Sequence, residues 1–539
     1  MTTITADDAD GGGALDRSRT VARAGFNRWL VPPAALAIHL CIGMSYGLSV
    51  FWLPMTKLLA KDDPSCKGAS YVSTLFSANC NWTVPDLLPI FTWGIVALGV
   101  SAALFGGWLE RAGPRKAAFI AALCWGGGFL FSGLGVQMHQ LWMLWLGLGI
   151  VGGIGLGLGY ISPVSTLVKW FPDRRGMATG MAIMGFGGGA MVGAPLANKL
   201  MAAYGVATTM FALGALYLAS MMIGAFSYRV PPDGWRPDGW TPPPAKPLVS
   251  TGEVSLAAAT TTPQFWLIWA VLFLNVSAGI GVIGMASPML QEIFGGDLVG
   301  KAGVGFAALD AADKAKLATL GAAFLGLISL FNIAGRFVWA SLSDAIGRKT
   351  TYFAFFALGI LLYVAAPNFA QMHSRPLFVA AICLILSMYG GGFATVPAYL
   401  ADMFGKQFVG AIHGRLLTAW SLAGLVGPLI VGWIRQSLIS AGTPDARLYD
   451  GTFYVLAALL AVGFVCNLLV RPVDPAKRMS DVELAAAQGH AKSGVAAAQS
   501  YGIGLGGLDA KAAFAWALIA IPVLWGLWQA LLGAAKIFG

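Results

Sequence analysis

Long uncharged apolar blocks are the feature of this chain that most limits its possible folds. The blocks run for about 20 to 28 residues and alternate with short polar segments. A helix needs about 20 apolar residues to cross a hydrocarbon core of about 30 Å. Only 11% of the residues are charged, whereas soluble domains carry about 25%. We therefore predict an all-α membrane protein whose length of 539 residues reflects helix number rather than several soluble domains.

Thirteen membrane spans are predicted, six on each side of a Pro-rich polar segment and one near the C-terminus. Their approximate limits are 30–56, 86–109, 117–137, 141–166, 176–203, 207–227, 264–291, 317–342, 350–368, 376–402, 412–434, 451–470 and 513–537. The predicted units are an N-terminal tail (1–29), a first six-helix half (30–227), a linker (228–263), a second half (264–470), a flexible tail (471–512) and an extra transmembrane helix (513–539). The linker assignment rests on its proline content.

The two halves carry matching loops. GGWLERAGPRK (106–116) follows the second span, and ASLSDAIGRK (340–349) follows the eighth. Each loop has small residues, an acid, a glycine and then basic residues. Because the two copies occupy equivalent places in two six-span halves, the pattern predicts an internal duplication.

The acid in each of these loops lies at the end of a helix. It opposes the helix dipole there unless a cation is close. Glu110 has Arg111 and Arg115 nearby, and Asp344 has Arg348 nearby. We expect these residues to form a conformational latch that holds the same ends of the two halves together in one state. Membrane anchoring by basic loops is the alternative interpretation.

The formal net charge of +10 does not indicate nucleic-acid binding. The basic residues lie in short loops on alternate sides of successive helices, which is the positive-inside pattern. We place segments 110–116, 169–175, 228–263, 343–349 and 403–411 on one side, and expect that side and the N-terminus to be cytoplasmic. The expected location is the plasma membrane, specifically a bacterial inner membrane, with the lipid bilayer as the surrounding solvent.

Arg336 is an ionisable residue placed well inside the eighth span. Such groups are costly at that depth and usually face a cavity, a partner or a substrate. A guanidinium facing a cavity can hold a carboxylate through two parallel hydrogen bonds. We therefore predict that the protein binds an anion at Arg336.

Five aromatic residues lie inside spans rather than at their ends, where an interfacial belt would place them. They are Tyr46, Trp93, Tyr160, Tyr389 and Trp420. Interior tyrosines need a partner for the hydroxyl group. Packing accounts for each residue alone, but as a set they are candidates to line a binding cavity around Arg336.

Two other polar residues, His39 and Asn275, also lie in the middle of spans. Hydrogen bonds between helices are the default interpretation for both. Proton coupling through His39 is an open alternative, so protons remain a candidate partner.

Cysteines and glycines suggest structural roles. Cys66 and Cys80 share the loop after the first span, which the charge pattern places outside. An oxidising outer compartment would allow a disulfide between them, and the unpaired state is the alternative.

The Gly-rich runs in 145–160 and 185–195 indicate close helix packing rather than a dinucleotide site. We expect no metal and no cofactor, because no CxxC or His-rich pattern appears.

At this point the chain resembles the major facilitator superfamily, and more narrowly its oxalate/formate antiporter family. The narrower resemblance is carried by LVKWFPDRRGMATGMAIMGFGGGA (167–190), TPQFWLIWAVLFLNVSAGI (262–280) and NIAGRFVWASLSDAIGRK (332–349). It covers about residues 30–470. The resemblance implies anion exchange by alternating access, with the two halves rocking about a site at the middle of the membrane.

The resemblance also implies a role for Arg336, which matches the substrate-binding arginine of the eighth helix in oxalate-exchanging members. Those members place a lysine in the eleventh helix, where Trp420 stands here. One cation suits a monoanion such as formate, lactate or pyruvate better than a dianion, because a buried charge without a partner is strongly unfavourable. Oxalate/formate exchange and proton-coupled symport stay open. The last span resembles single-span companion proteins found beside such transporters.

Other functional classes fit less well. A membrane enzyme or channel needs a catalytic cluster or a polar pore-lining repeat, and neither is present in the sequence. A non-transporting carboxylate sensor on the same scaffold would carry a signalling domain. A sugar carrier needs several mid-span Asn, Gln and Glu groups. We therefore expect a secondary transporter and no enzyme.

Overall fold

The computed structural model describes residues 13–23, 25–59, 71–232, 235–241, 249–250, 252–484 and 509–538. These residues are largely helical, and the one strand-like pairing among them is an isolated bridge between Val21 and Val230. Twelve of the described helices are long and apolar enough to cross a membrane. The prediction of an all-α, multi-pass membrane protein is therefore confirmed.

The first half is built from helices before the linker. They are α1 (Val31–Ile42), the 3₁₀ segment η3 (Gly43–Phe51), α2 (Trp52–Met55), α3 (Tyr71–Phe76), α4 (Val84–Ala112), α5 (Pro114–Gln137), α6 (Leu141–Leu144), the π-helical segment η5 (Trp145–Val151), α7 (Gly152–Trp170) and α8 (Arg175–Ser227). Within this set α8 packs on α1 and α5, and α7 packs on α4 and α5.

The second half follows the linker. Its helices are α9 (Leu256–Thr260), α10 (Pro263–Leu298), α11 (Ala311–Ile346), α12 (Arg348–Gln371), α13 (Arg375–Phe404), α14 (Val409–Leu416), α15 (Thr418–Ser440) and α16 (Asp450–Leu469). Here α11 packs on α13, while α10 packs on α15 and α16. The short 3₁₀ turns of the chain are η1 (Arg17–Thr20), η2 (Arg28–Leu30), η6 (Phe306–Ala308), η7 (Asp445–Arg447) and η8 (Pro475–Lys477).

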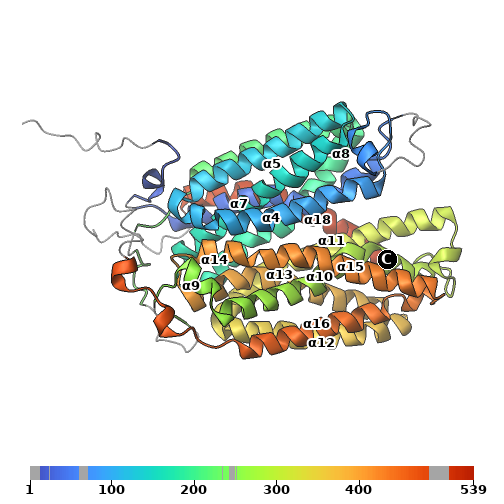
Figure 1. Ribbon diagram of the computed structural model, residues 1–539. Coiled ribbons are helices and arrows are strands. Elements are labelled where there is room, and N and C mark those ends of the chain that lie inside the picture. The colour runs from blue at the N-terminus through green and yellow to red at the C-terminus, as the bar shows by residue number, and fades with distance from the viewer. Residues whose placement is uncertain are drawn as a thin grey trace, which may run out of the picture.

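The two halves lie side by side as two bundles (Figure 1). They meet along two seams, which we define by their helices: α8 against α11, and α4 against α14 and α15. The first seam contains Arg336, and the second contains Glu110 and Trp420. The loops that carry the duplicated motifs lie at the end of the bundle nearest the first described residues, and we call this the basic end.

The duplicated loops share a backbone conformation. Gly113 ends α4 with φ 89° and ψ 156°, and Gly347 ends α11 with φ 89° and ψ 150°. A positive φ of this size is accessible to glycine at little cost and strains other residues. The matching angles support the predicted duplication of the halves.

Several predicted spans depart from simple helices. The fifth and sixth spans form the single helix α8, which is interrupted at Gly205 (φ 77°, ψ 174°). The first span changes from α to 3₁₀ at Gly43, where η3 packs closely on α8 and an added Cβ would collide with the Phe186 carbonyl. The eleventh span breaks at Leu417 into α14 and α15.

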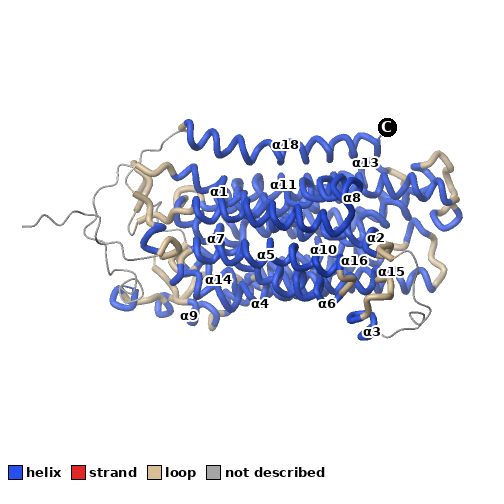
Figure 2. Tube along the Cα trace, turned by 90° about the horizontal axis from the view of Figure 1, so that it is seen from above, coloured by secondary structure: helices blue, strands red, loops and turns tan. Residues whose placement is uncertain are grey.

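The last helix, α18 (Ala510–Phe538), runs along the outside of the bundle (Figure 2). It contacts α8 and α11, so it lies over the first seam between the halves. Only 11% of its most apolar window is buried, compared with 33% to 83% for the other candidate spans. Its length and composition suit a membrane helix, and its role as a thirteenth span stays a prediction.

Candidate functional site

Arg336 lies ten residues before the end of α11 and is held there by two contacts. Its side chain is fully buried. The guanidinium donates from Nε to Asn332 Oδ1 at 2.9 Å and from Nη1 to the Ile183 carbonyl at 3.1 Å. Asn332 lies one turn earlier on the same helix, and Ile183 belongs to α8 in the other half. Arg336 therefore connects the two halves at the first seam.

Two phenylalanines flank the guanidinium. The Cζ atom of Arg336 lies 5.8 Å from the ring centroid of Phe186 and 5.4 Å from that of Phe393. A cation within about 6 Å of a ring is attracted by its quadrupole, more strongly where water is excluded. Phe186 comes from α8 and Phe393 from α13, so both halves contribute to this pair.

Four of the five predicted aromatic residues gather on the same group. Trp420 packs on Phe186, Phe393 and Tyr160, with ring centroids 5.2, 4.7 and 5.3 Å apart. The hydroxyl groups of Tyr46 and Tyr389 lie 3.3 Å apart and link η3 to α13 across the halves. Together with Arg336 these rings form what we call the central cluster.

Three hydrogen-bond donors in the central cluster are unpaired among the described residues. They are Nη2 of Arg336, the hydroxyl of Tyr160 and Nε1 of Trp420. Arg336 also takes part in none of the ion pairs of the described residues. A buried charge without a counter-charge costs several kcal/mol. The cluster therefore offers one positive charge and donors, which is the chemistry that an anion requires.

The basic end is arranged in the opposite way. Asp344 of α11 accepts hydrogen bonds from the backbone N–H groups of Gly176 and Met177, both at 2.9 Å. These N–H groups open helix α8 of the other half, where a carboxylate is favoured by the helix dipole. Arg348 donates to Asp344 at 2.5 Å. The predicted pairing of Asp344 with Arg348 is present, and the carboxylate also spans the halves.

A second acid crosses the same boundary. Asp402 of α13 pairs with Arg175 of α8 at 2.9 Å and with Arg348 of α12 at 3.2 Å. Arg348 thus bridges two carboxylates within the second half, and Arg175 adds the link to the first half. These contacts close the basic end of the first seam.

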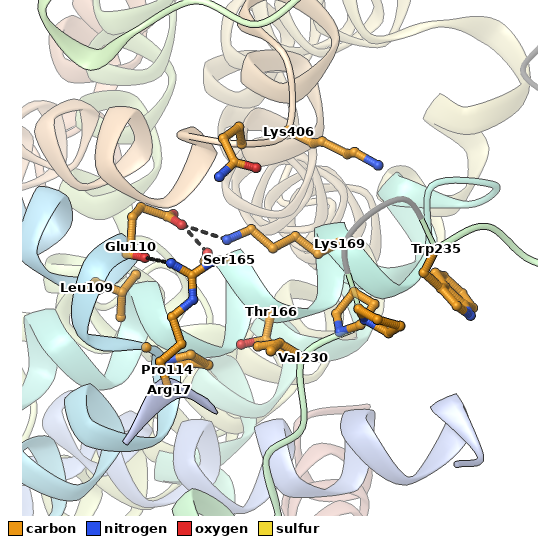
Figure 3. Close-up of a pocket in the computed structure, with 14 residues that line it drawn as sticks. Arg17, Leu109, Glu110, Pro114, Ser165, Thr166, Lys169, Val230, Trp235 and Lys406 are labelled. Carbon is orange, nitrogen blue, oxygen red and sulfur yellow. Dashed lines mark hydrogen bonds and ion pairs between the residues drawn. The ribbon is translucent and has the colours of Figure 1, made fainter. Parts of the chain in front are cut away.

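Glu110 contacts the opposite half at the second seam, and its partners differ from those expected. It pairs with Lys169 at 2.6 Å and accepts from the backbone N–H of Gly410 in the other half at 3.1 Å. Arg17 donates to its carbonyl (Figure 3).

The predicted pairing of Glu110 with Arg111 and Arg115 needs correction. Arg111 is exposed. Arg115 donates instead to the carbonyls of Ala14 and Tyr228, because these segments cover the start of α5.

A polar cavity of ≈ 110 Å³ lies beside Glu110 at the basic end (Figure 3). Residues from the N-terminal segment, α4, α7, the linker and the loop after α13 line it. Burial lowers the pKa of Lys406 in that loop, and the cations Arg175, Arg236 and Lys169 lower it further while Glu253 opposes them. This cavity is separate from the central cluster and shares no lining residue with it.

The remaining predicted residues lie elsewhere. Trp93 is 45% exposed and makes no ring contact with the central cluster within the described part of the chain. Cys80 is disulfide-bonded, but Cys66 lies outside the described residues, so their pairing stays a prediction.

His39 has both ring nitrogens against backbone carbonyls, Ala182 at 2.6 Å and Tyr160 at 3.3 Å. Among the residues searched, no group of three potential metal ligands gathers.

Sequence reasoning missed several members of these groups. Phe186 and Phe393 gave no signal, because phenylalanine is common in membrane helices. Asp402 and Arg175 are separated by 227 positions, and their contact depends on how the halves dock. The spacing of Asn332 and Arg336, four apart on one helix face, is a signal that could have been used.

Comparison with known proteins agrees with this architecture. The sequence profile described as Major Facilitator Superfamily matches residues 35–312 and 311–539. The oxalate:formate antiporter of Oxalobacter formigenes is 24% identical over 78% of this chain and 92% of its own length. Apicoplast pyruvate carrier 1 of Toxoplasma gondii is 24% identical over 82% of this chain and 89% of its own length.

A solved structure shares the fold. The crystal structure of the transporter FucP in the outward conformation superimposes with a TM-score of 0.54 at 11% identity, covering 82% of this chain and 99% of that one. Because the superfamily profile matches nearly the whole chain, the expected membership is confirmed. The protein is a member of the Major Facilitator Superfamily, a membrane transporter and not an enzyme.

Proposed function

We propose that the protein is a secondary transporter of small carboxylates that binds its substrate at Arg336. The observation that carries this proposal is the unpaired Nη2 of a fully buried arginine beside two further unpaired donors, Tyr160 and Trp420. A carboxylate would accept from these donors and cancel the buried charge. The named activities of the oxalate:formate antiporter and the pyruvate carrier support this substrate class.

Within this class we favour a monocarboxylate such as formate, lactate or pyruvate. The central cluster holds one guanidinium, and the eleventh-span position where the related exchangers have a lysine holds Trp420. A monoanion leaves the loaded site neutral, while a dianion would leave one buried negative charge. Oxalate/formate exchange therefore requires a second positive charge that the described cluster does not hold in its present form.

Transport would proceed by alternating access. The carboxylates of Asp344, Asp402 and Glu110 each bind a group of the opposite half at the basic end. We propose that these three contacts, which replace the predicted set in part, form the latch that keeps this end closed in the present conformation. Their release would open the central cluster toward the basic end. The positive-inside pattern supports a cytoplasmic basic end and N-terminus in a bacterial inner membrane.

Counterflow in proteoliposomes tests the proposal. Vesicles loaded with formate, lactate, pyruvate or oxalate would be diluted into the labelled anion at equal pH on both sides. At equal pH we expect accumulation of the labelled anion above its outside concentration to require internal anion, with monocarboxylates exchanging faster than oxalate. Binding without uptake would instead support a sensor on this scaffold, and the absence of both for every anion would refute the proposed substrate class.

A further inference from the structure

His413 is a fully buried histidine that belongs neither to the central cluster nor to the latch. It lies in α14, the first piece of the eleventh span. Neither Nδ1 nor Nε2 has a hydrogen-bond partner among the described residues. Leaving one buried polar group unpaired costs about 1–3 kcal/mol, and native structures seldom keep such a group without a reason. The fold therefore keeps an imidazole dry and unpaired at some cost in stability.

The position of His413 relates it to the central cluster. The ring centroid of His413 lies 5.8 Å from that of Tyr160. The Tyr160 ring centroid in turn lies 5.3 Å from that of Trp420. Tyr160 thus separates His413 from the arginine side of the cluster. Gly410, one turn before His413, is the residue whose N–H binds Glu110 of the latch. His413 therefore lies between the central cluster and the closed basic end.

Several other ionisable groups on the elements packed against α14 are already engaged. Glu110 on α4 pairs with Lys169 on α7, Asp402 on α13 pairs with Arg175 and Arg348, and Arg415 on α14 itself donates to Thr260 on α9. On α7, Tyr160 has an unpaired hydroxyl, and His39 lies behind it with both nitrogens on backbone carbonyls. His413 is thus the histidine in this region with both ring nitrogens unpaired among the described residues.

We propose that His413 is a proton-binding site, which takes up one proton when a carboxylate occupies Arg336, so that carboxylate and proton cross together. The inference rests on the proposed function and adds the coupled ion to it. A neutral imidazole has one N–H and one lone pair. The lone pair accepts the proton, an O–H bond of hydronium or of the carboxylic acid breaks, and the reverse transfer returns the proton to water on the other side.

Charge explains why the two events are coupled. Without substrate, the buried guanidinium of Arg336 opposes a second buried positive charge in the same bundle. A bound carboxylate cancels the guanidinium and so favours the imidazolium. By thermodynamic linkage, protonation of His413 strengthens carboxylate binding by the same factor. In the closed conformation the latch shields His413 from the basic end, so the proton exchanges only when that end opens.

Full-length protein in proteoliposomes provides the test. A pH-sensitive dye inside the vesicles would report proton movement while labelled formate, lactate or pyruvate is offered to empty vesicles under an acid-outside gradient. We expect the wild type to take up anion and to acidify the lumen beyond protein-free vesicles. For His413→Gln we expect gradient-driven uptake to fall by about 5- to 150-fold, the usual span of such couplings, while counterflow at equal pH persists.

The matched control is His373→Gln, because His373 is exposed and pairs with Asp297 away from the cluster. It should behave as wild type in both assays. Counterflow by His413→Gln also shows that the variant is folded. If the variant does not fold, the dye signal of the wild type still tests whether protons move with the carboxylate. Wild type that exchanges carboxylate but ignores the gradient would overturn the inference and leave the proposed function intact. Unchanged gradient-driven uptake in His413→Gln would overturn it too, whereas failure of counterflow in the wild type would refute the proposed function itself.

Discussion

The basic end and the central cluster treat polar groups in opposite ways. At the basic end, Asp344, Asp402 and Glu110 each have at least two partners, and each includes one from the opposite half. In the central cluster, Arg336 and Trp420 are fully buried, more deeply than these acids, yet each keeps an unpaired donor. Both regions lie on the seams between the halves, so position alone does not explain the difference.

The contrast separates a contact that holds a conformation from a site that awaits a ligand. Fully paired charges stabilise one arrangement of the halves and cost free energy when that arrangement changes. Unpaired donors are unfavourable in the structure alone and become favourable when an acceptor enters. We therefore expect substitutions at the basic end to change which state is populated, and substitutions in the centre to change what binds.

Arg336→Lys should have the largest effect. Lysine keeps the charge but loses the fork that binds Asn332, Ile183 and a carboxylate together. We expect carboxylate affinity to fall by about 2–5 kcal/mol, roughly 30-fold or more. Uptake in proteoliposomes and titration calorimetry would measure it. Arg415→Lys is the matched control, because Arg415 is exposed and donates only to Thr260 among the described side chains. Near-normal transport by Arg336→Lys would remove Arg336 from the binding site.

The sequence predicted some of this contrast and missed the rest for physical reasons. Arg336 could be found because a lone charge in a long apolar run is too costly to persist unless it faces a cavity, a partner or a substrate. His413 could not, since the predicted span began at residue 412 and placed it at a membrane surface, whereas α14 begins at Val409 and buries it. Trp93 was assigned to the cluster because sequence gives depth in the membrane but not the rotation of a helix about its axis.

The helix count shows the same limits. Apolar length predicted every long helix, because burial of backbone polar groups in lipid leaves few alternatives. The change to 3₁₀ geometry at Gly43 and the break at Leu417 follow from close contacts with other helices. Such contacts depend on which helices become neighbours, which local pattern does not specify.

Asp344→Asn tests the latch and should have the next largest effect. The amide loses the charge that binds Arg348 and the first N–H groups of α8, so the closed basic end should lose about 2 kcal/mol. We expect the open state to gain roughly 30-fold in relative population. Spin labels at Lys116→Cys in the first half and at Lys477→Cys, just after the second half, would report the separation.

Asp313→Asn is the control for this variant. Asp313 pairs with Lys301 within the second half, at the end of the bundle away from the latch. Lys301 is exposed, so loss of this pair should have little effect on stability and leave the distance distribution unchanged. An unchanged distribution in Asp344→Asn as well would show that the three carboxylates are not a latch.

Trp420→Lys should change selectivity more than total activity. A lysine here would add a second positive charge beside Arg336, and the loaded site would then be neutral with a dianion. We expect the ratio of oxalate to formate counterflow to rise by about tenfold, which corresponds to about 1.4 kcal/mol. Trp420→Phe keeps the ring and removes the Nε1 donor, so it should weaken binding without that change in ratio. Equal selectivity in all three proteins would mean that position 420 does not face the substrate.

Removal of α18 by ending the chain at residue 484 should have the smallest effect, although the helix touches both halves. Ala530 packs with Met191 of α8 and Ile333 of α11, and Ile333 is one turn from Arg336. Lipid chains are as apolar as the surface that α18 covers, so its removal forfeits packing rather than hydrophobic burial. The specific contacts are few: Lys199 lies 5.1 Å from the Trp525 ring, and Trp516 donates to the Trp29 carbonyl at 3.2 Å. We therefore expect the melting temperature to fall by about 2–4 °C and counterflow to persist. Lys199→Gln, which removes the cation alone, should reproduce part of that shift. Loss of folding on truncation would instead show that the arrangement of the two halves depends on α18, as it does on the contacts at the basic end.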